Sequence, residues 1–354
     1  MGVGVAVGAV VLAPILRTFD TASPTELLFI TMAVLVGAAF GGQALGLRLG
    51  ARLHATLPGS AGRSADRVAG AGVAVAGVVV SIWLLLPLLA DVPGWFAAQA
   101  RSSAIARVVE DRLPPPPDAV DSLRRLLGGS QLPRVFEALR RAPDLGPPPT
   151  VTNIDQAVLD RVVMSTVRVE GEACGRVQDG SGFVVGPELV VTNAHVVAGE
   201  RATVVQRSDG TEVAATVVVF DPDRDLVILR VPGLQRAALP LRDAEVGDVG
   251  AVFGHPGGGP LRAAPFEVGE ALTATGTDIY DARRTERDVL VLAAALHPGD
   301  SGAALVDPAG NVVGVAFAIA PDRGEVAYAL SVDELRPLLA GDLTQPVGTG
   351  SCLH

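Results

Sequence analysis

The sequence predicts an α-helical transmembrane bundle followed by an all-β domain of two closed barrels. Three observations support this prediction. The 354 residues are 49% hydrophobic and their mean hydropathy is +0.41, which is too apolar for one ordinary soluble domain. Residues 1–100 carry only nine charged side chains, five Arg and four acids. From residue 151 onward, short β-branched runs alternate with turn residues, a pattern typical of barrels.

Two long uncharged runs and one shorter apolar run define the helical part, which we place at residues 1–92. Leu27–Leu47 spans 21 residues and Val68–Ala90 spans 23, and a helix needs about 20 residues to cross a bilayer. Met1–Leu16 is the third run, so about three spans are expected. The alternatives are buried core helices for the long runs and a signal peptide for the first run, which lacks a basic start.

The placement of arginine orients these spans. The loop after the second span carries four arginines against one acid, Asp66. Loops rich in Arg stay in the cytoplasm, so the third span is expected to deliver everything after Ala90 to the other side. The sequence therefore predicts a multi-pass protein of the cell (inner) membrane, in contact with the lipid bilayer, whose large C-terminal part is extracytoplasmic (periplasmic).

A linker with short helices is expected at residues 93–150, where Pro114–Pro117 and Pro147–Pro149 form stiff spacers. The β domain is expected at residues 151–354. Its first barrel, second barrel and tail are expected at about 151–243, 244–340 and 341–354.

Eleven short runs are candidate strands. In the first barrel they lie at residues 162–169, 181–185, 189–192, 202–207, 213–220 and 226–231. In the second barrel they lie at residues 249–253, 289–294, 302–306, 312–318 and 326–330. Asp209–Gly210 is a typical hairpin turn, and a closing helix is expected at residues 333–340.

The composition excludes several kinds of chemistry. The net charge is −10 and all 28 basic residues are Arg, so lysine Schiff-base chemistry is excluded. An acidic chain does not favour nucleic acid as a partner, because phosphates need a basic face. Two cysteines cannot build a four-cysteine zinc site. No metal and no cofactor are expected.

Three motifs on the β scaffold carry chemistry. TNAHVV contains His195 at the end of a β-run, DRDLVIL contains Asp225 at the start of one, and GDSG contains Ser301. Hydrolysis of an amide by serine needs a base, an acid that orients the base, and backbone N–H groups aimed at the developing oxyanion. Gly299 allows such a turn because it has no Cβ.

These motifs, in the order His, Asp, Ser, resemble the chymotrypsin-like serine proteases, particularly the bacterial HtrA-type branch. The helical part resembles the colicin V production protein family. Their combination, with the ending TQPVGTGSC (residues 344–352), looks like the actinobacterial MarP-type acid-resistance periplasmic proteases. That family has four spans where three are found here, which leaves open whether an N-terminal span is missing from this sequence.

The resemblance implies a role for each motif residue. His195 would be the general base, Asp225 its orienting acid and Ser301 the nucleophile. The N–H groups of Gly299 and Ser301 would form the oxyanion hole. It also implies a modest apolar substrate pocket, without a demand for a basic residue, formed by Ala295, Val315, Ala316 and Phe317.

Other residues compete for these roles. Asp221 and Asp223 are rival acids, although the DLVIL context favours Asp225. His255 and His297 are rival bases, which we interpret as structural or as part of the site wall.

The two cysteines, Cys174 and Cys352, both fall on the predicted extracytoplasmic side, where disulfides persist. The MarP-type family has a bridge at this place, so the resemblance implies a Cys174–Cys352 disulfide. Free buried thiols are the alternative.

The sequence thus predicts a membrane-anchored serine endopeptidase that cleaves envelope proteins through an acyl-enzyme, in acid or envelope stress resistance. Its partners would be protein or peptide substrates, and no oligomeric state is predicted. Activity should rise from about pH 5 to about pH 8, because the base must be neutral. GDSG is followed by Ala303–Ala304, where the family usually has Gly-Pro. The alternative is therefore a membrane-tethered peptide-binding scaffold with a degenerate protease fold.

Overall fold

The computed structural model divides the chain into two compact units, Met1–Ser130 and Gln131–Leu353. The structure describes residues 142–150, 154–173 and 176–353, together with isolated positions between residues 37 and 108. In these described parts, no helix is long and apolar enough to cross a membrane. The three predicted spans, and most of the predicted linker, lie almost entirely outside the described residues.

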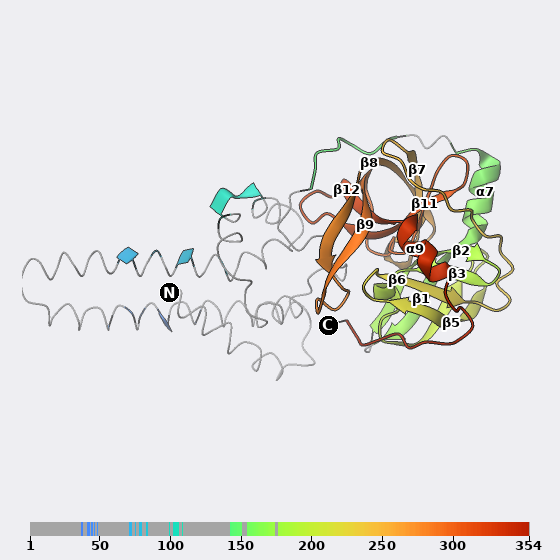
Figure 1. The fold of residues 1–354 in the computed structure, drawn as a ribbon, viewed down its shortest axis with the longest axis horizontal. Coiled ribbons are helices and arrows are strands. Elements are labelled where there is room, and N and C mark those ends of the chain that lie inside the picture. Colours follow the sequence, from blue (N-terminus) through green and yellow to red (C-terminus); the bar gives the residue numbers. More distant parts are fainter. Residues whose placement is uncertain are drawn as a thin grey trace, which may run out of the picture. The chain divides into compact units, whose positions relative to one another are not determined.

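Six antiparallel strands form the first barrel, the lower one in Figure 1. They close in the order β1-β2-β3-β6-β5-β4. The strands are β1 (Thr166–Ala173), β2 (Arg176–Gly186), β3 (Leu189–Thr192), β4 (Glu200–Gln206), β5 (Glu212–Asp221) and β6 (Leu226–Arg230). The β4–β5 hairpin turns at Gly210, whose φ is +82°, as the Asp209–Gly210 pair predicts.

Six further strands form the second barrel, which closes in the order β10-β11-β12-β9-β8-β7. The strands are β7 (Val249–Gly254), β8 (Arg262–Thr277), β9 (Arg284–Ala294), β10 (Ala304–Val306), β11 (Val312–Ile319) and β12 (Val326–Ser331). The two closed barrels confirm the prediction of an all-β domain.

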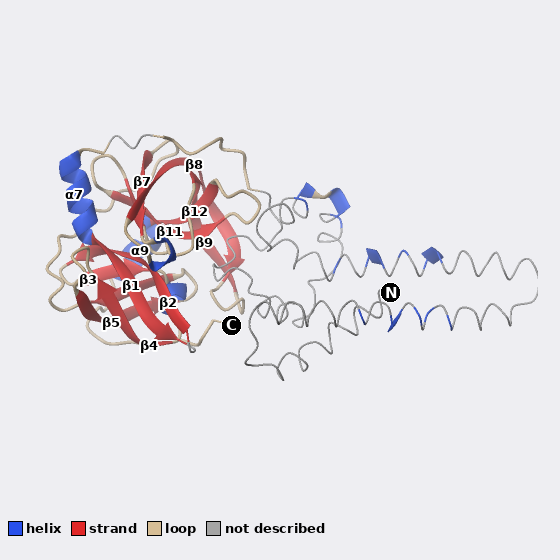
Figure 2. Ribbon diagram, turned by 180° about the vertical axis from the view of Figure 1, so that it is seen from behind, coloured by secondary structure: helices blue, strands red, loops and turns tan. Residues whose placement is uncertain are grey.

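Four short helical elements flank the barrels, and Figure 2 labels two of them, α7 and α9. They are α7 (Gln156–Ser165), α8 (Ala194–Val197), the 3-10 turn η2 (Pro256–Gly258) and α9 (Val332–Leu339). Ser331 is the N-cap of α9, and its hydroxyl accepts from Asp333 N, as expected of an N-cap serine. The helix contacts β6 of the first barrel and β9, β11 and β12 of the second, so it lies at the junction of the barrels.

Three expectations about local structure were wrong. Residues 162–165 belong to α7, because the run from Gln156 buries one helical face through Val162 and Ser165. Strand β8 was not predicted, because Pro265 interrupts its alternating pattern and a bulge shifts its register between Val268 and Glu270. His195 does not end a β-run: β3 stops at residue 192, and the histidine lies on α8.

The hydrophobic core has a part that both barrels share. Phe183 and Ile228 of the first barrel pack in one buried cluster with Phe253 and Phe317 of the second. Burying about four such large side chains contributes several kcal/mol, so the barrels are held face to face. Any site at the junction of the barrels therefore rests on this shared, buried apolar cluster.

The segment after α9 returns to the first barrel. Val347 N donates to Val217 O on β5 at 2.9 Å, and Gly199 N donates to Thr349 O at 3.0 Å. The hydroxyl of Thr349 donates to the carbonyl of Glu200 at 2.8 Å. This segment therefore covers the start of β4.

Candidate active site

His195 and Asp225 meet because the strands before them are paired. β3 and β6 run antiparallel, with Thr192 opposite Val227, so the end of β3 lies beside the start of β6. Asp225 Oδ1 accepts from His195 N at 2.9 Å and Oδ2 lies 2.8 Å from His195 Nδ1. Asp225 is fully buried and His195 is 6% exposed. The carboxylate therefore fixes the ring, assigns the proton to Nδ1 and leaves Nε2 for chemistry.

The rival acids are engaged elsewhere. Asp221 accepts from the backbone of Asp223 and Arg224 and pairs with the Arg224 guanidinium at 2.9 Å. The side chain of Asp223 is 42% exposed and pairs with Arg283 at 2.8 Å. Asp225 adopts a left-handed backbone, with φ of +59°, which Asp tolerates better than most residues. The structure brings only Asp225, of these three, to His195.

Arg287 is a site residue that the sequence analysis missed. It lies on β9 of the second barrel, is 2% exposed, and donates to the carbonyls of Asp223 and Thr277 at 2.6 Å. Burial lowers the pKa of Arg287, while the nearby charge of Asp225 opposes that change. The guanidinium thus fixes the loop before Asp225 and provides positive charge near its carboxylate. No local motif marks such a residue, because its partners are distant in sequence.

Ser301 lies on a tight turn with glycine on both flanks. Gly299 and Gly302 have φ of +96° and +82°, where a side chain is strained. A Cβ at Gly299 would collide with Gly257 N, and one at Gly302 would collide with Ser181 O. Ser301 is 7% exposed. Both glycines are therefore required by geometry.

Asp300 supports this turn from inside. Its Oδ2 accepts from His297 N at 2.9 Å, and its backbone N donates to His297 O at 3.0 Å. Burial raises the pKa of the Asp300 carboxyl. Ala303 follows without distortion: it is fully buried, and Ala316 N donates to its carbonyl at 2.9 Å. The departure from Gly-Pro is therefore accommodated.

The N–H groups of Gly299 and Ser301 are available to a ligand. In residues 176–353, which the structure describes without a gap, neither N–H donates a hydrogen bond within the protein. Buried backbone donors are nearly always paired. Two unpaired donors on one turn are the arrangement that binds an oxyanion.

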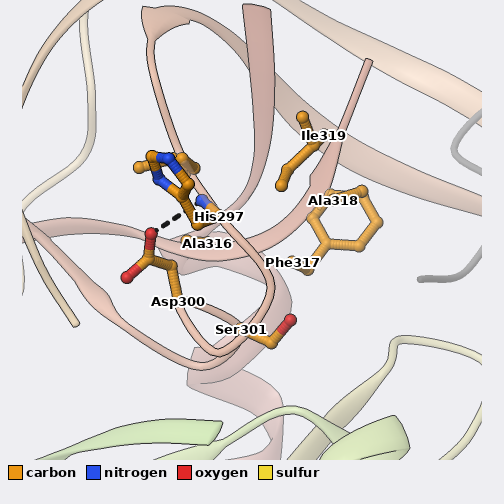
Figure 3. Close-up of a pocket in the computed structure, with 8 residues that line it drawn as sticks. His297, Asp300, Ser301, Ala316, Phe317, Ala318 and Ile319 are labelled. Carbon is orange, nitrogen blue, oxygen red and sulfur yellow. Dashed lines mark hydrogen bonds between the residues drawn. The ribbon is translucent and has the colours of Figure 1, made fainter. Parts of the chain in front are cut away.

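A small pocket opens beside Ser301 (Figure 3). His297, Asp300 and Ser301 lie on one turn, with Phe317 and Ile319 opposite. The full lining is Leu296, His297, Asp300, Ser301, Ala316, Phe317, Ala318 and Ile319.

The structure places two of the four expected pocket residues in this lining and two outside it. Ala316 and Phe317 line the pocket, whereas Ala295 and Val315 do not. The register of β11 shifts between Ala316 and Ala318, so consecutive side chains reach the pocket there. Strict alternation along β11 would not predict this.

Neither rival histidine contacts a carboxylate through its ring. His255 Nδ1 lies 2.9 Å from Gly259 O, and burial lowers the His255 pKa. His297 Nδ1 lies 2.9 Å from Arg262 Nη1. Among the described residues, no group of three or more His, Cys, Asp or Glu side chains could hold a metal ion.

Comparison with known proteins defines the class to which this site belongs. A family model of the trypsin-like peptidase domain matches residues 180–315. The chain is 38% identical over 302 residues to the serine protease Rv3671c of Mycobacterium tuberculosis, covering 82% of this chain and 76% of that protein. It is 31% identical over 189 residues to the chloroplastic protease Do-like 1 of Arabidopsis thaliana, covering 48% of this chain and 41% of that protein.

A solved structure extends this likeness to the fold. The crystal structure of the active form of the Rv3671c protease from M. tuberculosis matches with a TM-score of 0.57 and 38% identity, covering 62% of this chain and 100% of that chain. The fold, the site and these matches define a trypsin-like serine protease. The chain belongs to the MarP-type family, the family of Rv3671c.

Proposed function

We propose that this protein is a membrane-anchored, extracytoplasmic endopeptidase that uses His195, Asp225 and Ser301 as its catalytic triad. The observation that carries the triad is a pair of hydrogen bonds: the buried Asp225 carboxylate binds both the backbone N–H and the ring Nδ1 of His195. Gly180 provides a second link, because a Cβ there would touch both Val196 on α8 and the Ser301 carbonyl. Helix α8, which carries the proposed base, and the turn that carries the proposed nucleophile therefore both lie beside Gly180.

Each group has a defined step in this reaction. His195 Nε2 takes the Ser301 hydroxyl proton as Oγ attacks the scissile carbonyl carbon. The N–H groups of Gly299 and Ser301 stabilise the resulting oxyanion. Collapse of the intermediate breaks the C–N bond, and the leaving amine receives the proton from His195. In the second stage, His195 takes a proton from water as the water attacks the acyl carbon. The ester bond to Ser301 then breaks, His195 returns the proton to Oγ, and the carboxylic acid product leaves.

The pocket supports a preference for apolar side chains at the cleaved residue. Leu296, Phe317 and Ile319 provide apolar walls. The one carboxylate in the lining, Asp300, already accepts from His297 N. A substrate arginine or lysine would therefore find no unengaged acid among these lining residues.

The membrane anchor, the periplasmic location and the role in acid or envelope stress are part of the same proposal. The uncharged runs at Leu27–Leu47 and Val68–Ala90 support the anchor. The positive loop between them supports the orientation. Envelope proteins are the substrates that such an enzyme would reach.

The Cys174–Cys352 disulfide is also proposed. Cys352 carries no free thiol, and it packs against Gly199, the residue before β4 of the first barrel. Cys174 lies outside the described residues. The bridge would hold the segment after α9 on the first barrel, and thiol titration of the denatured, unreduced protein tests it. Two free thiols per chain would refute the bridge.

Labelling with a fluorophosphonate tests the enzymatic proposal on the full chain in membranes. The protein should be labelled, and Ser301→Ala should abolish both labelling and peptide cleavage. Asp223→Asn, at an exposed carboxylate outside the proposed triad, should be labelled normally. Peptide binding without labelling would instead support the scaffold alternative.

A further inference from the structure

Ser181 joins the two barrels at the oxyanion turn. It lies on β2 of the first barrel and is fully buried. Its hydroxyl donates to the carbonyl of Gly299 in the second barrel at 2.7 Å. The same oxygen accepts from His255 N at 2.8 Å, so its proton is directed to Gly299. Ser181 N also donates to Ser301 O at 2.8 Å.

The other carbonyls of this turn are held by backbone donors. Pro298 O accepts from Gly257 N at 2.7 Å, and Asp300 O accepts from Ala303 N at 3.0 Å. In a trans peptide the C=O and N–H point in opposite directions, and no described peptide is cis. These two bonds therefore direct the N–H groups of residues 299 and 301 away from the protein donors and into the site.

The peptide between Gly299 and Asp300 links these two N–H groups. Glycine rotates with little steric resistance, so this peptide needs a partner that fixes it. Its N–H, that of Asp300, donates to His297 O at 3.0 Å, whereas its carbonyl is held only by a side chain, the hydroxyl of Ser181. Of the hydrogen bonds to the carbonyls of this turn, only the one from the Ser181 hydroxyl comes from a side chain and can be removed by a substitution.

We propose that Ser181 is a positioning residue that holds the oxyanion hole in its working shape from the opposite barrel. This inference rests on the proposed role of Gly299 and Ser301 as the hole. Without the hydroxyl, the Gly299–Asp300 peptide is held only through the Asp300 N–H, so the turn can shift at Gly299 and move the Gly299 N–H out of line. The loss would fall on the transition state, because the oxyanion forms only there.

Ser181→Ala on the full chain tests the inference, with Ser165→Ala as a matched control. Ser165 is also fully buried, and its hydroxyl donates to a distant backbone carbonyl, that of Ala237, at 2.8 Å. Ser181→Ala should lower kcat about 10-fold or more, less than the loss of a direct oxyanion donor. KM should stay within about 2-fold, since ground-state binding is untouched.

A peptide boronate, which forms a tetrahedral adduct with serine, provides the second readout. Ser181→Ala should weaken boronate inhibition by the same factor as kcat, whereas Ser165→Ala should lower only the melting temperature. Equal effects of the two variants on kcat, or a loss confined to KM, would overturn the inference. If Ser301→Ala abolishes cleavage while Ser181→Ala is unchanged, the positioning role fails and the proposed function stands. If Ser301→Ala still cleaves, the proposed function itself fails.

Discussion

The two barrels hold their parts of the site in different ways. The first barrel presents His195 and Asp225 at the ends of paired strands and fixes them by bonds to each other's functional groups. The second barrel presents Ser301 on a glycine-flanked turn, where backbone geometry decides the arrangement. Activity should therefore be sensitive to side-chain chemistry in the part of the site on the first barrel. In the part on the second barrel, it should be sensitive to the addition of any Cβ.

The largest expected effect is that of Asp225→Asn. Asparagine tolerates the left-handed backbone but lacks the charge that orients the ring and stabilises the imidazolium, so kcat should fall about 10⁴-fold. Steady-state cleavage of a peptide substrate measures this. Asp223→Asn, at an exposed carboxylate two residues away, should change kcat less than about 3-fold. A similar loss in both variants would mean that the loop, rather than the carboxylate, matters.

Gly299→Ala tests the backbone half. The new Cβ would collide with Gly257 N, so the turn must shift and kcat should fall about 10²- to 10³-fold. Gly210→Ala is the control, because Gly210 has a similar φ of +82° but no atom within 4 Å of the position that a Cβ would occupy. It should lose stability only. Full activity in Gly299→Ala would contradict a hole at this turn.

Arg287→Met tests the link between the halves, because this side chain of the second barrel fixes the acid loop of the first. Removing the guanidinium leaves the carbonyls of Asp223 and Thr277 unpaired, and the free energy of unfolding should fall by about 3 kcal/mol. Urea unfolding measures this. Arg283→Met, at an exposed pair with Asp223, should cost under about 1 kcal/mol. Equal costs would show that burial of Arg287 does not matter.

Glu200 extends the comparison to the dependence of stability on pH, with an expected effect of similar size. Burial raises its pKa from 4.5 to about 7, while the Thr203 hydroxyl bond opposes the rise and the charge of Glu170 adds to it. The folded state therefore binds this proton more tightly than the unfolded state. Its contribution to stability is complete below about pH 4.5 and is lost as the pH rises through about 7.

This contribution is worth about 3 kcal/mol across that window. Glu200→Gln should remove it, so the unfolding free energies at pH 5 and pH 8 should differ less in the variant than in the parent. Glu212→Gln, at an exposed position on the neighbouring β5, should leave the slope unchanged. If the unfolding free energies of the parent and Glu200→Gln changed with pH in parallel, Glu200 would not be the source of this pH dependence.

The sequence was sufficient for the parts of the site that lie in contiguous motifs. Asp225 and Ser301 each stand in a contiguous motif from which the local strand or turn could be predicted. His195 also stands in such a motif, although its strand ends at Thr192 and the histidine lies on α8. Ser181 and Arg287 could not be predicted, because they act on backbone groups 118 and 64 residues away. Strand β8 was missed because a bulge breaks the alternation that sequence reasoning depends on.

The segment after α9 has a consequence for the order in which this chain can fold. Arg230 of β6 donates to Leu343 O, 113 residues further along, and Glu200 O accepts from Thr349 across 149 residues. These contacts on the first barrel are therefore made by residues that leave the ribosome only after the whole second barrel. Contacts of such long sequence separation form late and slowly. Synthesis thus delays the docking of the segment after α9 on the first barrel until both barrels exist.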